Sequence, residues 1–113
     1  MPNILQLLAV IMAGVSVGIA DSLIKRIALT GSFWSALKSP WMAVILLLIL
    51  VQVSFFIFVF RRHWDLSIAG NIHIVFYSLT IILSGLLIFG EKISLTQGVG
   101  ISLAMVGVVL MNI

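Results

Sequence analysis

The chain has 113 residues, of which 63% are hydrophobic and only 8% are charged, and its formal net charge is +3. Soluble domains carry charge on roughly 25% of their residues, so this composition excludes a soluble globular protein and predicts an integral membrane protein. The six basic residues are scattered through the predicted loops instead of clustering on one face. A nucleic-acid-binding surface is therefore not expected.

The charged residues divide the chain into four apolar blocks. An α-helix needs about 20 residues to cross a bilayer, and each block approaches or exceeds that length. We therefore expect one all-α domain of four transmembrane helices, at about residues 4–29, 40–60, 66–89 and 95–112. The first block is too long and its continuation too hydrophobic for a cleavable signal peptide, so it is kept as a helix.

The first apolar block carries a polar face near its end, formed by Gly14, Gly18, Asp21, Ser22 and Lys25 at helical spacing. A carboxylate near hydrocarbon costs at least about 2.5 kcal/mol on insertion scales, so such a residue normally faces protein or water and marks a functional site. Asp21 is the leading candidate for binding a proton or a cationic group, with Lys25 beside it. Alternatively, because about 27 Å of helix precedes Asp21, it ends the span and anchors it at the interface.

The third block holds a stripe of polar side chains at helical spacing, namely His73, Tyr77, Thr80 and Ser84. Such a stripe must face protein or water. Histidine exchanges protons near neutral pH, so His73 and Tyr77 are candidates for hydrogen-bonding a substrate or forming a second proton site. The alternative is that His73 makes one structural hydrogen bond to a neighbouring helix.

The last block has a smooth face of small residues, Gly100, Ala104 and Gly107. Such faces let two membrane helices approach backbone to backbone. We expect these residues to pack a dimer, because four helices cannot both enclose a substrate pathway and present surfaces to lipid. Packing within one subunit is the alternative.

No pairing of a nucleophile with a base and no cluster of metal ligands is visible in the sequence. The chain also has no cysteine, which excludes disulfides and thiolate metal sites. We therefore expect neither enzymatic activity nor a metal or cofactor.

The last quarter of the chain carries a recognisable glycine pattern. Residues 89–94 read FGEKIS, and they are followed by GVG at 98–100 and by AMVGVVL at 104–110. This pattern resembles the end of a drug/metabolite transporter repeat, which closes with a Gly-Glu loop and a glycine-bearing helix. The length and four-span plan are similar to the small multidrug resistance family and to the flippase subunits for undecaprenyl-phosphate-linked aminoarabinose. The likeness covers the whole chain, but it is specific only in the last quarter.

The resemblance has implications for individual positions. Gly100 and Gly107 match the seven-residue glycine spacing through which the last helices of small multidrug resistance proteins dimerise. Lys25 matches a lysine near the end of the family's first helix. Eight residues before that lysine the cation exporters have their essential glutamate, and here the position is Val17. Asp21 lies one turn beyond Val17 on the same face, where a displaced carboxylate would substitute for it.

Two further positions bear on the branch of the family. Gly70 and His73 stand where the exporters' third helix has a tyrosine and a tryptophan, which argues against a typical exporter of quaternary ammonium or guanidinium compounds. Glu91 resembles the Gly-Glu loop of the broader superfamily and of the lipid-sugar flippase subunits. The flippase-like or general metabolite branch is therefore favoured.

Together these observations predict a small dimeric transporter that moves a small metabolite, an organic cation or a lipid-linked sugar by alternating access. Its partners would be membrane lipid and a second copy or a related subunit, in the inner membrane of a prokaryotic cell. The loop charges give only a weak preference for an external amino terminus, so an antiparallel homodimer is compatible with them. The alternative is a non-transporting membrane subunit that assembles with a partner through the fourth helix.

Overall fold

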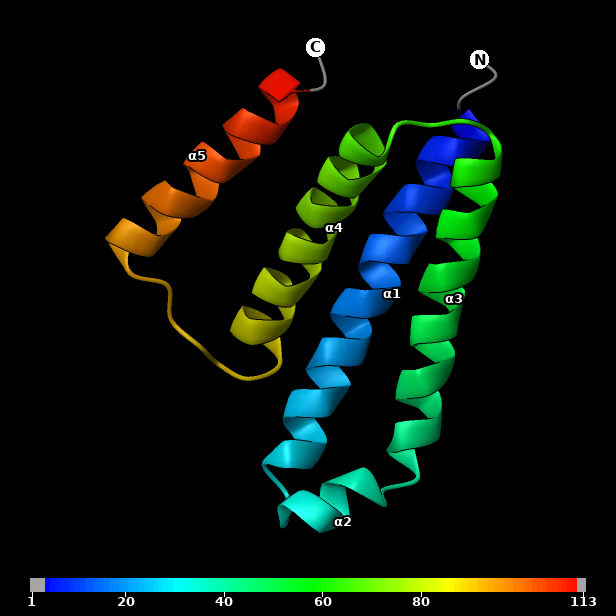
Figure 1. The fold of residues 1–113 in the computed structure, drawn as a ribbon. Helices are drawn as coiled ribbons and strands as arrows, with labels where there is room; N and C mark the ends of the chain where they lie inside the picture. The colour runs from blue at the N-terminus through cyan, green and yellow to red at the C-terminus, as the bar shows by residue number, and fades with distance from the viewer. Residues whose placement is uncertain (1–3, 112–113) are drawn as a thin grey trace.

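The computed structural model describes residues 4–111, and every regular element in that range is an α-helix. The helices are α1 (Ile4–Ala28), α2 (Phe33–Leu37), α3 (Trp41–Arg61), α4 (Leu66–Leu87) and α5 (Leu95–Met111). In Figure 1, α1 lies between α3 and α4, α5 stands apart on the far side of α4, and α2 crosses the lower end of α1 and α3. Asn112, the expected last residue of the fourth span, lies outside the described residues.

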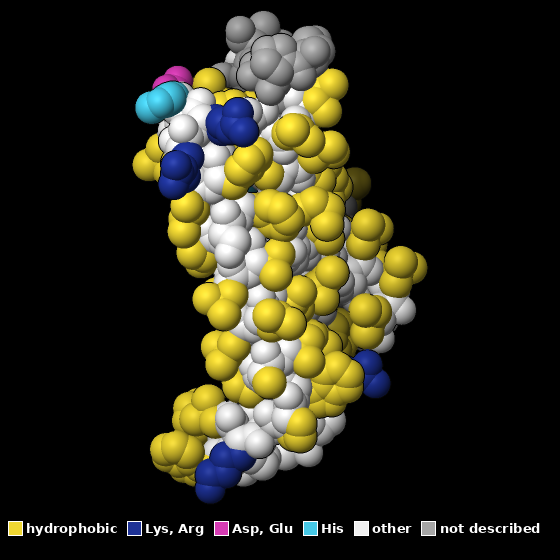
Figure 2. All heavy atoms as spheres, turned by 90° about the vertical axis from the view of Figure 1, so that its right-hand side faces the viewer, with side chains coloured by type: hydrophobic (Ala, Val, Ile, Leu, Met, Phe, Trp, Pro, Cys, Tyr) yellow, Lys and Arg dark blue, Asp and Glu magenta, His cyan; other side chains and the backbone are white. Residues whose placement is uncertain are grey.

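Three of these helices, α1, α3 and α4, are long and apolar enough to cross a membrane. This finding indicates an integral membrane protein, as the composition predicts. Figure 2 views the α3 side and shows hydrophobic side chains along the length of this face, with most of the visible lysine and arginine side chains near its two ends. Helix α5 has 17 residues, fewer than the roughly 20 that a full span needs, so a fourth span stays a prediction.

The ends of the helices follow from local sequence. Ser32 caps α2, and its hydroxyl accepts a hydrogen bond from the Ser35 N–H at 3.1 Å, so part of the connection between the first two spans is helical. Helix α4 ends at Leu87, two residues before the expected boundary. Gly90 adopts a positive φ of 64°, which turns the chain so that the Glu91 N–H donates to the Gly85 carbonyl at 2.9 Å.

Helix α4 packs closely against two glycines of α1, with its backbone at Gly14 and with the Thr80 side chain at Gly18. A Cβ added at Gly14 would lie 2.8 Å from the carbonyl oxygen of His73, and one added at Gly18 would lie 2.6 Å from Cβ of Thr80. Small residues permit this approach, which maximises van der Waals contact between membrane helices. The predicted polar stripe of α4 therefore meets the glycine-bearing face of α1.

Helix α1 is also the core of the bundle, because it has a neighbour on each side. Val10 is fully buried in a cluster with Val59 of α3 and Ala69 of α4. A second cluster near the other end joins Ala20 to Ile45 of α3. Within the part of α5 whose side chains the structure describes, no residue is buried. The chain thus forms a three-helix bundle with a loosely attached fourth long helix.

The α1–α4 contact makes a stability prediction. Replacing Gly18 by Val puts two methyl groups against Thr80, so we expect the free energy of unfolding to fall by about 1–3 kcal/mol, the usual cost of overpacking. The measurement is loss of helical circular dichroism during titration of the detergent-solubilised protein with sodium dodecyl sulfate. Gly70→Val is the matched control, because a Cβ at Gly70 meets nothing within 4 Å. Equal stability of the two variants would contradict this packing.

Candidate functional site

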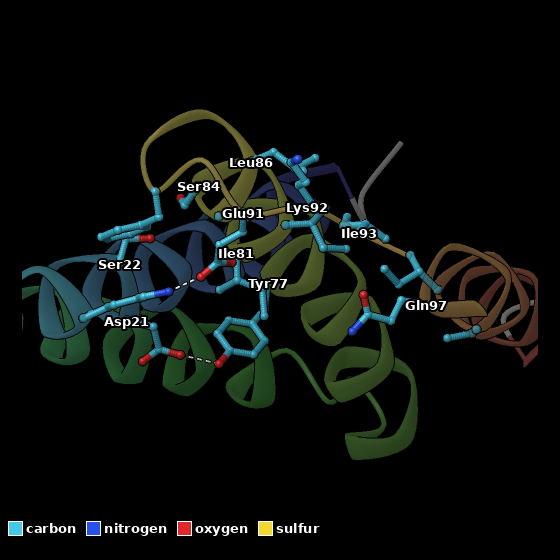
Figure 3. Close-up of a pocket in the computed structure, with 17 residues that line it drawn as sticks. Asp21, Ser22, Tyr77, Ile81, Ser84, Leu86, Glu91, Lys92, Ile93 and Gln97 are labelled. Carbon is cyan, nitrogen blue, oxygen red and sulfur yellow. Dashed lines mark hydrogen bonds and ion pairs between the residues drawn. The ribbon is translucent and has the colours of Figure 1, made fainter. Parts of the chain in front are cut away.

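A cavity of about 750 Å³ lies between α1, α4, α5 and the 88–94 loop (Figure 3). Sites for small molecules usually measure roughly 300–1,000 Å³, so the cavity is large enough for a ligand. Its polar lining residues are Asp21, Ser22, Lys25, Tyr77, Ser84, Glu91, Lys92 and Gln97. The remainder of the wall is largely apolar.

Asp21 and Tyr77 meet at this cavity. The Tyr77 hydroxyl donates a hydrogen bond to Oδ2 of the Asp21 carboxylate, and the two side chains point toward each other in Figure 3. This bond links α1 to α4 just beyond the close contact at Gly18. A carboxylate can accept about four hydrogen bonds, so Asp21 retains acceptor capacity for a ligand in the cavity. Both side chains are half-buried.

A second pair closes the loop side of the cavity. Lys25 Nζ forms an ion pair with Glu91, and the same ammonium lies 4.8 Å from the centroid of the Phe89 ring. The Lys25 and Glu91 side chains are 44% and 49% exposed, so their ion pair contributes at most about 1 kcal/mol. The Glu91 side chain also folds over the α-carbon of Gly85, where a Cβ would collide with it. The pair therefore ties the 88–94 loop to the end of α1.

The start of α5 is fixed by a reciprocal cap. The Ser94 N–H donates to Oε1 of Gln97 at 2.9 Å, and the Gln97 N–H donates to the Ser94 hydroxyl at 3.1 Å. This is a capping box, which satisfies two backbone donors that a helix start leaves unpaired. The cap holds the Gln97 side chain beside the cavity.

His73 lies outside the cavity, unlike the other three sequence-predicted binding residues Asp21, Lys25 and Tyr77. Its ring packs against Phe56 of α3 at 4.9 Å between centroids and stacks on Tyr77 at 6.1 Å. Its Nε2 is buried and has no hydrogen-bond partner within residues 4–111. His73 therefore packs against the Tyr77 ring and does not line this cavity.

The residues predicted to pack a dimer lie largely at the cavity. Gly100 and Ala104 line it from α5. A Cβ added at Gly100 or Gly107 would meet nothing within 4 Å. The face therefore has room for another helix, but in this single chain part of it borders the cavity.

A smaller space of about 220 Å³ lies between α4 and α5. We call it the α4–α5 groove, and its lining residues are Ile74, Val75, Ser78, Ile81, Ile82, Ile101, Ala104 and Met105. Four of these residues, Ile81, Ile82, Ile101 and Ala104, also line the cavity. The groove and the cavity therefore adjoin.

Sequence reasoning did not assign Glu91 or Gln97 to the site. Glu91 served only as a family marker, although Lys25 in the last turn of α1 and Glu91 after α4 carry opposite charges at the same end of the bundle. These opposite charges could have predicted the Lys25–Glu91 ion pair. The Ser94-x-x-Gln97 spacing is typical of a capping box and could have predicted the position of the Gln97 side chain at the start of α5. Among residues 4–111, no group of three His, Asp or Glu side chains is positioned to hold a metal ion.

We expect the Lys25–Glu91 ion pair to restrain the 88–94 loop. In Glu91→Gln the ion pair is lost, so we expect backbone amides of this loop to exchange hydrogen at least about threefold faster, with overall stability lowered by at most about 1 kcal/mol. Hydrogen exchange read by mass spectrometry measures both effects. Lys92→Gln changes a neighbouring charge while keeping the pair and should leave exchange unaltered. Equal exchange in Glu91→Gln and the unmodified protein would show that the pair does not restrain the loop.

Comparisons of this chain with protein-family models, with curated proteins and with solved structures each found no match. The resemblance to drug/metabolite transporters accordingly rests on the sequence motifs alone. The cavity and its side chains carry the functional inference.

Proposed function

We propose that the chain is a small membrane transporter of the drug/metabolite type, working as a dimer by alternating access. The observation that carries this proposal is the Asp21–Tyr77 pair, a carboxylate on a membrane-length helix that faces a cavity of about 750 Å³. A carboxylate so close to hydrocarbon is costly and is usually retained for function. The substrate would be a small metabolite, an organic cation or a lipid-linked sugar.

In this mechanism Asp21 binds either a proton or a cationic group of the substrate. One carboxylate cannot hold both at once, so occupancy by substrate releases the proton and couples the two movements. The Tyr77 hydroxyl orients the carboxylate by its hydrogen bond, and the His73 ring stacks on the Tyr77 ring. Val17, where the cation exporters have their glutamate, does not line the cavity, whereas Asp21 does. This geometry favours Asp21 as the displaced binding group.

A second subunit would complete the pathway. The cavity is bounded on one side by α5, which leaves the bundle and exposes most of its surface. A homodimer, in parallel or antiparallel orientation, or a pairing with a related subunit would cover that surface in the membrane. Rocking of one bundle against the other would then expose the site alternately to the two sides. The inner membrane of a prokaryotic cell is the proposed location.

The transport mechanism predicts the effect of Asp21→Asn. Asparagine keeps the size of the side chain and can still accept the Tyr77 hydrogen bond, but it cannot bind a proton or attract a cation. We expect at least a tenfold loss of proton release when substrate is added. The measurement is the pH change of purified protein in weakly buffered detergent, with a panel of organic cations and polyprenyl-phosphate sugars.

Asp65→Asn is the matched control, since Asp65 is an exposed aspartate at the start of α4 and does not line the cavity. It should release protons as the unmodified protein does. Release that is unchanged in Asp21→Asn would remove Asp21 from the mechanism.

A non-transporting assembly subunit is a second candidate function. The exposed surface of α5 and the open space at Gly107 favour it. This candidate and the transporter differ in one respect. An assembly subunit alone would release no protons with any member of the substrate panel.

Both candidates require helix association, which Gly107→Leu tests. The larger side chain should keep a partner helix from approaching closely, so we expect at least a tenfold weaker dimer. Energy transfer between donor-labelled and acceptor-labelled copies in vesicles measures the association. Gly98→Leu is the control, because Gly98 borders a different surface depression of α5. Equal association of the two variants would exclude the Gly107 face as the interface.

A further inference from the structure

Helix α2 carries an apolar surface that the bundle does not cover. Its exposed side chains Phe33, Trp34 and Leu37 lie on one face, at offsets of one and four residues along the helix. Phe33 is 71% exposed and Trp34 is 67% exposed, and their rings meet edge to face at 5.5 Å between centroids. Ala36 packs against the buried cluster of α1 and α3. Helix α2 is thus attached through Ala36 and presents its aromatic face outward.

The position of α2 in the fold places this face at the surface of a bilayer. The helix crosses the ends of α1 and α3, both of which are long and apolar enough to span a membrane (Figure 1). A helix that joins the ends of two spans lies at the membrane–water interface. Trp34 belongs to α2 and Trp41 begins α3. Tryptophan is enriched at this depth, because its ring is apolar and its N–H is polar.

Cations accompany the aromatic side chains at this end of the bundle. Lys38 follows α2 directly and is exposed. Arg26, in the last turn of α1, is exposed as well. Among residues 4–111 neither of them forms an ion pair, whereas the neighbouring Lys25 is paired with Glu91. Lys38 and Arg26 are therefore available to an anion from outside the chain.

The two ends of the bundle differ in charge. The last turn of α1 and the loops at 29–40 and 88–94 together hold four basic residues and one acidic residue. The loop at 61–65, at the other end, holds two basic residues and one acidic residue. Anionic lipids give a bilayer surface a negative potential that attracts basic segments beside membrane helices. The α2 end therefore has the charge that suits such a surface.

We propose that α2 lies in the headgroup layer of the bilayer and binds anionic phospholipid there. Phe33, Trp34 and Leu37 would insert at the boundary between headgroups and acyl chains. Lys38 would extend its charged end to the lipid phosphate, while its aliphatic stem stays against apolar surface. The occupant is a lipid of the surrounding bilayer, outside the cavity, so the proposal does not depend on the transport function.

This placement of α2 also gives the depth of the cavity in the bilayer. Asp21 precedes the end of α1 at Ala28 by seven residues, which is about 10 Å of helix. Half of the hydrocarbon core measures about 15 Å. With α2 in the headgroup layer, the Asp21 carboxylate therefore lies on the α2 side of the bilayer midplane.

Fluorescence quenching tests the assignment. The chain has no cysteine, so Ser35→Cys gives a single site on α2 for attaching a fluorophore. The labelled protein is placed in nanodiscs with equal amounts of phosphatidylcholine and phosphatidylglycerol, one of which carries a nitroxide near the top of its acyl chain. We expect nitroxide on phosphatidylglycerol to quench at least about twofold more strongly than nitroxide on phosphatidylcholine. Salt at about 0.5 M should reduce this preference, because it screens the charges.

Matched variants identify the side chain responsible. Lys38→Gln removes the cation beside α2 and should remove at least about half of the preference for phosphatidylglycerol. Arg61→Gln makes an equal change of charge at the other end of the bundle and should leave the preference unaltered. Asp21→Asn should leave it unaltered as well, since the cavity takes no part. Helical circular dichroism checks that each variant folds, and quenching in the unmodified sequence background is decisive without them.

Two results would overturn the proposal. Equal quenching by the two lipids would show that α2 does not select anionic headgroups. Weak quenching by both lipids would show that α2 lies outside the headgroup layer, whether the label is then reached by iodide in the water or covered by a second copy of the chain.

Discussion

The arrangement of this chain depends on the close approach of α1 and α4 at Gly14 and Gly18. Membrane helices gain little from the hydrophobic effect when they associate, so backbone contact and interhelical hydrogen bonds hold them together. Gly14 provides the backbone contact, Gly18 admits the Thr80 side chain, and the Asp21–Tyr77 bond is the interhelical hydrogen bond. The same contact that stabilises the bundle thus brings a carboxylate of one helix to the phenol of another, at the edge of the cavity.

The turn after α4 sets the direction in which α5 leaves the bundle. The positive φ of Gly90 reverses the chain, the Glu91 amide binds the Gly85 carbonyl, and the Glu91 side chain reaches Lys25 of α1. The loop is therefore fastened to the bundle while the helix that follows it diverges from α4. This divergence leaves room for the cavity and the adjoining α4–α5 groove.

Much of this fold follows from the sequence, because polarity and helical period locate the helices and their polar faces. Asp21, Lys25 and Tyr77, which the pattern selected, all line one cavity. Helical periodicity shows which residues share one face of a helix, but it does not show which other helix packs against that face. The sequence therefore predicts close helix packing at the small residues of the last helix, whereas the structure shows such packing at Gly14 and Gly18 of α1. The separation of His73 from the cavity depends on the rotation of α4 against α1 and α3, which the stripe alone does not define.

Helices α4 and α5 are attached to the rest of the chain in different ways. Helices α1 and α4 are held together by the close contacts at Gly14 and Gly18 and by the Asp21–Tyr77 hydrogen bond. Helix α5 has few neighbours and is attached through a short segment that bends at Gly90. A change of backbone angles at Gly90 would therefore move α5 and, with it, the part of the cavity wall that Gly100 and Ala104 contribute.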